Sequence, residues 1–144
     1  MPRATFENLR IYELSEKLSD QVWSVSRWNS LARDTVGKQL VRAADSIGAN
    51  IAEGSGRGRS QDYRRFLRMA RGSLYETLHW LRRAYTRKLI TPKQTEDLRL
   101  LVAELSPTLN AYLRSVSKSA ASAKDLRPKA KDQKLNDASE RQLT

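Results

Sequence analysis

The chain contains no cysteine, which excludes a disulfide framework, a thiolate metal site and a cysteine nucleophile. Proline and glycine are scarce, with 4 and 6 residues in 144, and this composition favours helices. The single histidine, His79, has no second histidine or acidic pair at ligand spacing, so we expect no metal site. No apolar run reaches the roughly 20 residues of a membrane helix, and the N-terminus lacks a signal-peptide pattern. We expect a cytoplasmic protein with no cofactor and no membrane partner.

The sequence has fewer acidic residues than basic ones. The sequence holds 27 Lys and Arg against 16 Asp and Glu, a formal net charge of +11. The excess is not confined to the C-terminal tail, because residues 1–116 hold 20 basic and 12 acidic residues and residues 117–144 hold 7 and 4. A basic balance favours nucleic acid or an anionic membrane surface as the partner, although it can also serve only solubility.

Apolar residues that recur every three or four positions predict four amphipathic helices. The predicted ranges are Leu9–Trp28, Asp34–Glu53, Gln61–Lys88 and a fourth helix that begins at Thr91 and Pro92. We expect Asp34 to cap the second helix. Thr91 and Gln94 have the spacing of a capping box. Short connections favour an all-α, antiparallel up-down four-helix bundle.

We assign residues 1–117 to the bundle and residues 118–144 to a basic tail. Pro107 predicts a kink in the fourth helix, or a restart capped by Ser106. The tail has little to bury, so we expect disorder, with Ser119–Asp125 able to extend the helix.

Glycines and small residues predict how the second helix packs. Ala44, Gly48 and Ala52 stand at four-residue spacing, which lets another backbone approach closely. Gly54 suits the left-handed position after a helix. The glycine loop that follows lacks the ending of a phosphate-binding P-loop, so we interpret it as a hairpin turn.

The third predicted helix combines a core stripe with a basic face. The expected core stripe is Tyr63, Leu67, Ala70, Leu74, Leu78, Leu81 and Tyr85, and Phe66, Thr77, Trp80 and Ala84 extend it on one side. Between Arg57 and Lys88 there are ten basic residues and two acidic ones. Arginine suits bidentate contact with phosphate, and Tyr75 offers a stacking surface for a base. The candidate nucleic-acid-binding residues are Arg57, Arg59, Arg64, Arg65, Arg68, Arg71, Arg82 and Arg83.

An alternative hypothesis is that the same face is a solvated surface or an ion-pair surface between subunits. In an ion-pair surface, the partners of the arginines are the acidic residues of the first helix, namely Glu7, Glu13, Glu16 and Asp20. The sequence does not decide between nucleic-acid binding and this alternative.

A polar stripe on the second helix and a polar segment on the third predict a structural network. Its members are Arg42, Ser46, Asn50, Glu53, Ser73 and Glu76. We expect Arg42 to pair with Glu76 or Glu53, and Asn50 to bond a neighbouring backbone group. Two carboxyl groups could also serve a glycosidase. No sugar site with stacking aromatics accompanies them, so we expect no enzyme.

Two segments resemble a known family. They are Gln39–Gly54, with its Ser-Ile-x-x-Asn-Ile-Ala-Glu-Gly run, and Phe66-Leu67 followed by Ala70–Glu76. They are similar to the small bacterial four-helix-bundle proteins of the 23S rRNA intervening-sequence, or S23, family, over about residues 6–116.

The resemblance implies an antiparallel bundle that assembles as a ring-like homopentamer. It also points to the accessory proteins of diversity-generating retroelements, which bind RNA and a reverse transcriptase through basic surfaces. No catalytic residues come with the family. We therefore expect an oligomer that binds structured RNA through the arginines, or alternatively a scaffold whose basic face docks a protein partner or a sister subunit.

Overall fold

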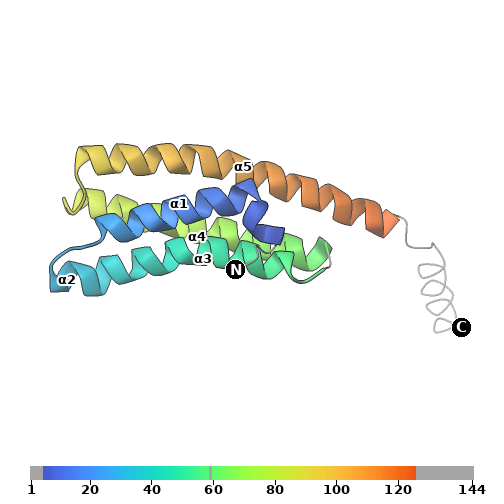
Figure 1. The fold of residues 1–144 in the computed structure, drawn as a ribbon, viewed down its shortest axis with the longest axis horizontal. Coiled ribbons are helices and arrows are strands. Elements are labelled where there is room, and N and C mark those ends of the chain that lie inside the picture. Colours follow the sequence, from blue (N-terminus) through green and yellow to red (C-terminus); the bar gives the residue numbers. More distant parts are fainter. Residues whose placement is uncertain (1–4, 59, 126–144) are drawn as a thin grey trace, which may run out of the picture.

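The computed structural model describes residues 5–58 and 60–125, and every regular element within them is helical (Figure 1). Four long helices form a bundle: α1 (Arg10–Val25), α3 (Lys38–Ser55), α4 (Ser60–Thr86) and α5 (Pro92–Asp125). Three short segments accompany them: η1 (Thr5–Asn8), α2 (Ser30–Ala32) and the π-helical η2 (Arg33–Gly37).

The four helices surround the core in the order α1, α3, α4, α5. Helix α3 packs against α1 and α4, and α5 packs against α4 and α1. Figure 1 places the connection after α1 and the turn between α4 and α5 at the left, and the turn between α3 and α4 at the right. The surface between α1 and α3 therefore lies on the opposite side of the bundle from the surface between α4 and α5.

The apolar stripes of the first two predicted helices form the core as expected. The buried members are Ile11, Leu14, Leu18, Val22, Val25, Val36, Leu40, Ala43, Ile47 and Ile51. Each fully buried aliphatic side chain stabilises the fold by about 1.5–3 kcal/mol relative to leaving it in water.

Beyond Leu74 the core face of α4 follows the predicted extension of the stripe and not the stripe itself. Leu78 and Tyr85 are 36% and 57% exposed, whereas Thr77 and Ala84 of the extension are buried. The buried positions 67, 70, 74, 77 and 84 follow the repeat of about 3.5 residues that supercoiled helices use. The predicted stripe followed the longer period of a straight helix, so it left the core over the second half of α4.

The start of the second predicted helix is wrong by four residues. Asn29 caps it, because its Oδ1 accepts a hydrogen bond from the Ala32 amide at 3.1 Å. Asp34 lies inside η2 instead. The capping box before α5 is confirmed: the Thr91 amide donates to Gln94 Oε1 at 3.0 Å, and the Gln94 amide donates to Thr91 Oγ1 at 3.1 Å.

Two glycines permit close approach between helices. A Cβ on Gly48 would lie 3.0 Å from Ser15 Oγ, so the predicted close neighbour of the small-residue stripe is α1. A Cβ on Gly54 would lie 2.7 Å from Phe66 Cβ. Gly54 is helical and buried, so its predicted left-handed role is wrong; Gly58, with φ of +72°, has that conformation.

Helix α5 passes through Pro107 without a restart. Figure 1 shows the helix changing direction partway along and extending past the other three at the right. Residues 118–125 continue the helix, so the extension over Ser119–Asp125 is observed. The rest of the tail, 126–144, lies outside the described residues.

Candidate nucleic-acid interface

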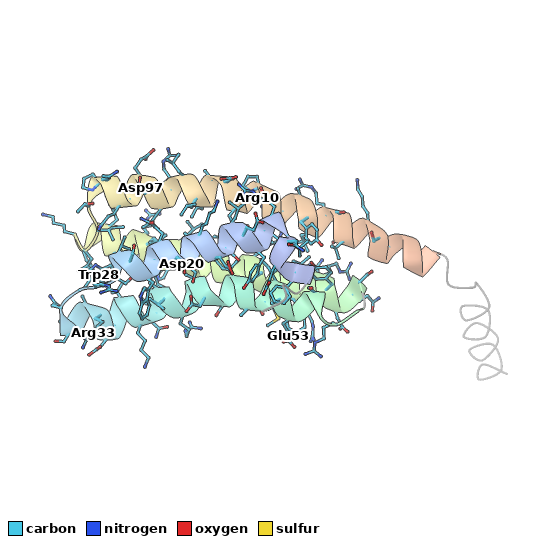
Figure 2. The ribbon with its side chains drawn as sticks, viewed as in Figure 1. Arg10, Asp20, Trp28, Arg33, Glu53 and Asp97 are labelled. Carbon is cyan, nitrogen blue, oxygen red and sulfur yellow. The ribbon has the colours of Figure 1, made fainter. Side chains whose placement is uncertain are left out.

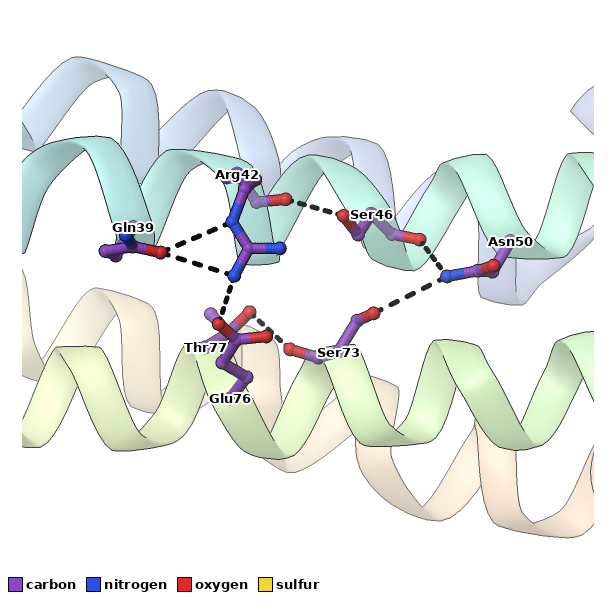
Figure 3. A network of polar contacts seen from close by, with 7 residues as sticks. All are labelled: Gln39, Arg42, Ser46, Asn50, Ser73, Glu76 and Thr77. Atoms are coloured by element: carbon purple, nitrogen blue, oxygen red, sulfur yellow. Dashed lines mark hydrogen bonds and ion pairs between the residues drawn. The ribbon is translucent and has the colours of Figure 1, made fainter.

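A polar network links α3 to α4 (Figure 3). Arg42 forms an ion pair with Glu76, and its guanidinium also donates to Gln39 Oε1 at 3.3 Å. Asn50 Nδ2 donates to the Ser46 carbonyl at 2.9 Å and lies 3.5 Å from Ser73 Oγ. These contacts fix the α3–α4 hairpin on which the arginines stand.

Glu53 stands outside that network. Its Oε1 accepts a hydrogen bond from Arg57 Nη2 at 2.6 Å, one turn along the chain. Glu53 and Glu76 thus pair with different arginines and do not face each other across a shared site. The arrangement offers no pair of carboxyl groups for acid–base catalysis.

The arginines nearest the glycine loop meet over one aromatic ring. The guanidinium carbons of Arg57 and Arg65 each lie 5.1 Å from the centre of the buried Phe66 ring. Cation–π contact of this kind contributes about 0.5–1 kcal/mol at exposed sites. Arg59, between them in sequence, lies outside the described residues.

A groove between α4 and α5 brings four cationic side chains together. Its volume is about 390 Å³, and we call it the basic groove. The lining residues are Arg68, Arg71, Asn110, Leu113, Arg114, Ser117 and Lys118. Arg71 Nη1 donates to Asn110 Oδ1 at 3.4 Å, which orients one guanidinium across the groove.

The charges of the basic groove have no carboxylate partner among the residues that the structure describes. None of the ion pairs formed by residues 5–58 and 60–125 includes a side chain of this groove. Four cations without carboxylate partners raise the local concentration of anions and suit a phosphate backbone.

A tyrosine pair joins the two walls near this groove. The Tyr63 hydroxyl on α4 and the Tyr112 hydroxyl on α5 form a hydrogen bond of 2.9 Å. The rings meet edge to face at 5.8 Å. Burial, reinforced by this hydrogen bond, raises the pKa of Tyr63 above its usual value. The phenol therefore stays neutral and holds α4 to α5 at ordinary pH.

The remaining predicted arginines lie elsewhere on α4. Arg64 and Arg83 are half-buried. Arg82 lines an apolar cleft of about 250 Å³ with Leu78 and Tyr85, which continues the α4–α5 surface away from the basic groove. The seven predicted arginines that the structure describes are therefore spread over α4 and the turn before it, and of these seven only Arg68 and Arg71 enter the basic groove.

Sequence reasoning missed two cations of the basic groove, Arg114 and Lys118. They lie on α5, whereas the binding residues were predicted from the high density of arginine in the third predicted helix. The available signal was the spacing of Asn110, Arg114 and Lys118, which places them on one face of a helix. Finding it also required knowing that α5 continues past residue 117.

A second groove, between α1 and α3, has the opposite charge. It has a volume of about 370 Å³ and contains Glu16, Asp20 and Asp45 beside the small residues Gly48 and Ala49. Ser19 donates a hydrogen bond to Asp45. Burial, and then the neighbouring Glu16 carboxylate, raise the pKa of Tyr12 in the same groove. We call this the acidic groove.

Comparison with known proteins identifies the family. The model of the 23S rRNA-intervening sequence proteins matches residues 7–111. The chain belongs to this family. The four long helices of the structure agree with the fold that the sequence resemblance to this family implied.

A solved relative supports the same fold for this family member. It is a protein of unknown function of the S23 ribosomal protein family from Bacteroides thetaiotaomicron, 24% identical, with a TM-score of 0.66. The match covers 71% of this chain and 96% of that one. No curated protein matches the chain. None of the helices in the described part has the length and apolar content to cross a membrane.

Proposed function

We propose that the chain is a non-enzymatic, cytoplasmic protein that binds structured RNA through the basic groove. The observation that carries the proposal is the convergence of Arg68, Arg71, Arg114 and Lys118 from two helices, with no carboxylate partner in the described part of the chain. The family is named after 23S rRNA, and this name is the only support that family membership gives to a link with ribosomal RNA.

The physics of the groove favours phosphate contact over base reading. Guanidinium groups grip phosphate oxygens in pairs and carry no sequence information by doing so. Tyr75, 54% exposed on the same helix, offers one stacking surface beside them. Recognition would therefore depend on the shape of the RNA, and affinity would fall steeply with salt.

The decisive test is charge reversal with a matched control. Arg68 and Arg114 are exposed, so Arg68→Glu with Arg114→Glu should leave the fold intact. The control, Lys17→Glu with Lys93→Glu, makes the same change in net charge at exposed sites outside the groove. Affinity for a structured RNA is measured by fluorescence anisotropy at fixed salt.

We expect the groove variant to lose about a hundredfold in affinity and the control about tenfold or less, since distant exposed charges are screened. Equal losses in the two variants would show a diffuse charge effect and contradict a binding groove. Circular dichroism of both variants verifies that the helices remain.

We further propose that the subunits assemble head to tail as an antiparallel-bundle homo-oligomer, a pentamer by the family resemblance. The acidic and basic grooves support this, because they have similar size, opposite charge and opposite positions on the bundle. A contact between two different surfaces generates rings when the rotation closes. The same basic groove could dock another acidic protein, such as a reverse transcriptase.

A further inference from the structure

A third cleft lies at the end of the bundle where α1 leads into α2. It has a volume of about 730 Å³, the size range of small-molecule sites. Figure 2 shows Trp28 and Arg33 at this end, far from Glu53 at the glycine-loop end. The lining residues are Trp23, Ser26, Arg27, Trp28, Arg33, Asp34, Gly37, Lys38, Val41 and Arg42.

Two of the three tryptophans of the chain line this cleft. Trp23 is 62% exposed and contributes little to the core. Trp28 is half-buried, and its ring lies against Gly37, where an added Cβ would be 3.6 Å from Trp28 Cε3. One ring is thus held in place and the other is open to solvent, an arrangement that offers flat apolar surface to a ligand.

Cationic side chains surround these rings. Arg33 is bonded to Asp34 at 3.1 Å, and Arg42 is paired with Glu76. Arg27 and Lys38 form no ion pair within residues 5–58 and 60–125. The cleft therefore combines aromatic surface with two cations that lack carboxylate partners, the composition that single-stranded nucleic-acid sites use.

The backbone at the cleft is irregular. Asp34, Gly37 and Arg33 come from η2, a single π-helical turn between α2 and α3. Such turns are rare and occur often at functional sites. Here the turn brings Gly37 under the Trp28 ring and places Lys38 at the rim.

We propose that this cleft binds an unpaired nucleotide of an RNA strand, with its base on Trp23 and Trp28 and its phosphate near Arg27 and Lys38. The inference rests on the proposed function, because the nucleotide belongs to the RNA held in the basic groove. Charge complementarity selects this occupant: an apolar protein helix would cover the rings and leave two buried cations without a partner.

The test compares the affinities of the full-length chain for two RNAs. One is a blunt hairpin, and the other is the same hairpin with a short unpaired tail. We expect the tail to raise affinity about tenfold and to quench tryptophan fluorescence, because one stacked base is worth about that much. Trp23→Ala and Lys38→Ala should each remove most of the gain, and Trp23→Phe should keep it.

The controls separate this inference from the proposed function. Lys17→Ala removes an exposed cation on α1 outside the cleft and should leave the gain unchanged. Equal affinity for the two RNAs, with no effect of Trp23→Ala, would overturn the cleft inference and leave the basic groove standing. A chain that binds neither RNA at low salt would overturn both. Adenosine monophosphate that binds as tightly as the tailed RNA would show a free-nucleotide site and also overturn it.

Discussion

The basic and acidic grooves are alike in size and differ in almost everything else. Both lie between two packed helices and enclose about 390 and 370 Å³. The basic groove is walled by long cationic side chains of α4 and α5. The acidic groove contains short carboxylates and small residues, because Gly48 brings α1 close to α3.

This difference shows that the net charge of +11 is distributed unevenly over the surface. Solubility alone does not require acidic and basic residues to lie in separate grooves on opposite sides of the bundle. Charge separated across the bundle can orient the molecule toward a polyanion or toward a second copy of itself. The two partners would compete for the same basic groove.

The largest expected effect concerns assembly. Glu16→Arg with Asp20→Arg makes both grooves basic, so head-to-tail contacts become repulsive and the oligomer should dissociate to monomers. Adding Arg68→Glu, Arg71→Glu and Arg114→Glu to the same chain leaves three carboxylates beside Lys118 in the former basic groove, so it exchanges the two charges and should restore the oligomer. Light scattering after size exclusion measures the mass of each species.

Mixing two variants that each change one groove sharpens this prediction further. Glu16→Arg with Asp20→Arg has two basic grooves, and Arg68→Glu with Arg71→Glu and Arg114→Glu has two acidic grooves, so the subunits must alternate. A ring with an odd number of subunits cannot alternate completely, and the mixture should form even or open assemblies in place of a pentamer. An unchanged mass for every variant would exclude the grooves as the subunit interface.

The fold could be predicted from the sequence because its signals are local. The stripes of Leu18 and Leu40, the Thr91–Gln94 capping box and the small residues around Gly48 each act within one or two turns. Both Leu78 and its neighbour Thr77 were core candidates on α4, because only packing against the other helices decides which of the two is buried.

The candidate sites depended on information that no single helix contains. The Arg42–Glu76 pair was predictable, since it joins consecutive helices of one hairpin. The basic groove needs Arg114 and Lys118 on α5 to face Arg68 on α4, which requires the register between two helices. The tryptophan cleft needs the π-helical turn at Gly37, and no residue pattern in the sequence indicated it.

The next largest effect distinguishes how tightly α3 packs against α4 and against α1. Gly54→Ala places a Cβ 2.7 Å from Phe66 Cβ, which is attached to the backbone and cannot rotate away. We expect a loss of about 1–2 kcal/mol in the free energy of unfolding, since overpacking outweighs the better helix propensity of alanine.

Gly48→Ala, in the acidic groove, is the matched substitution. Its Cβ meets the Ser15 hydroxyl at 3.0 Å, and the end of a side chain can move. The change should therefore stay within about 0.5 kcal/mol of the parent, because propensity offsets the tight contact. Urea denaturation measures both values, and equal losses would mean that the α3–α4 and α1–α3 contacts are packed alike.

A smaller effect tests the tyrosine pair that joins the helices of the basic groove. Tyr63→Phe removes the hydrogen bond to Tyr112 and should cost about 1 kcal/mol at neutral pH. The exposed Tyr85→Phe should cost almost nothing.

The same pair predicts a dependence on alkaline pH. The native pKa of Tyr63 is raised, so the unfolded chain loses this proton first, at about pH 10. The stabilisation is complete below that pH and is lost as the pH rises toward the native value. Stability of the parent should fall more steeply above pH 10 than that of Tyr63→Phe, and parallel curves would contradict the raised pKa.

The smallest effect isolates one cation of the basic groove. Lys118→Ala should reduce the slope of log affinity against log salt concentration by about 0.7–0.9, because one phosphate contact is lost and fewer counterions are released. Lys17→Ala, on the acidic side of the bundle, should leave the slope unchanged. Lys118 stands at the end of the groove, on the part of α5 that continues past residue 117, the predicted end of the bundle. A reduced slope would therefore assign RNA contact to the helical extension itself, whereas an unchanged slope would confine binding to Arg68, Arg71 and Arg114.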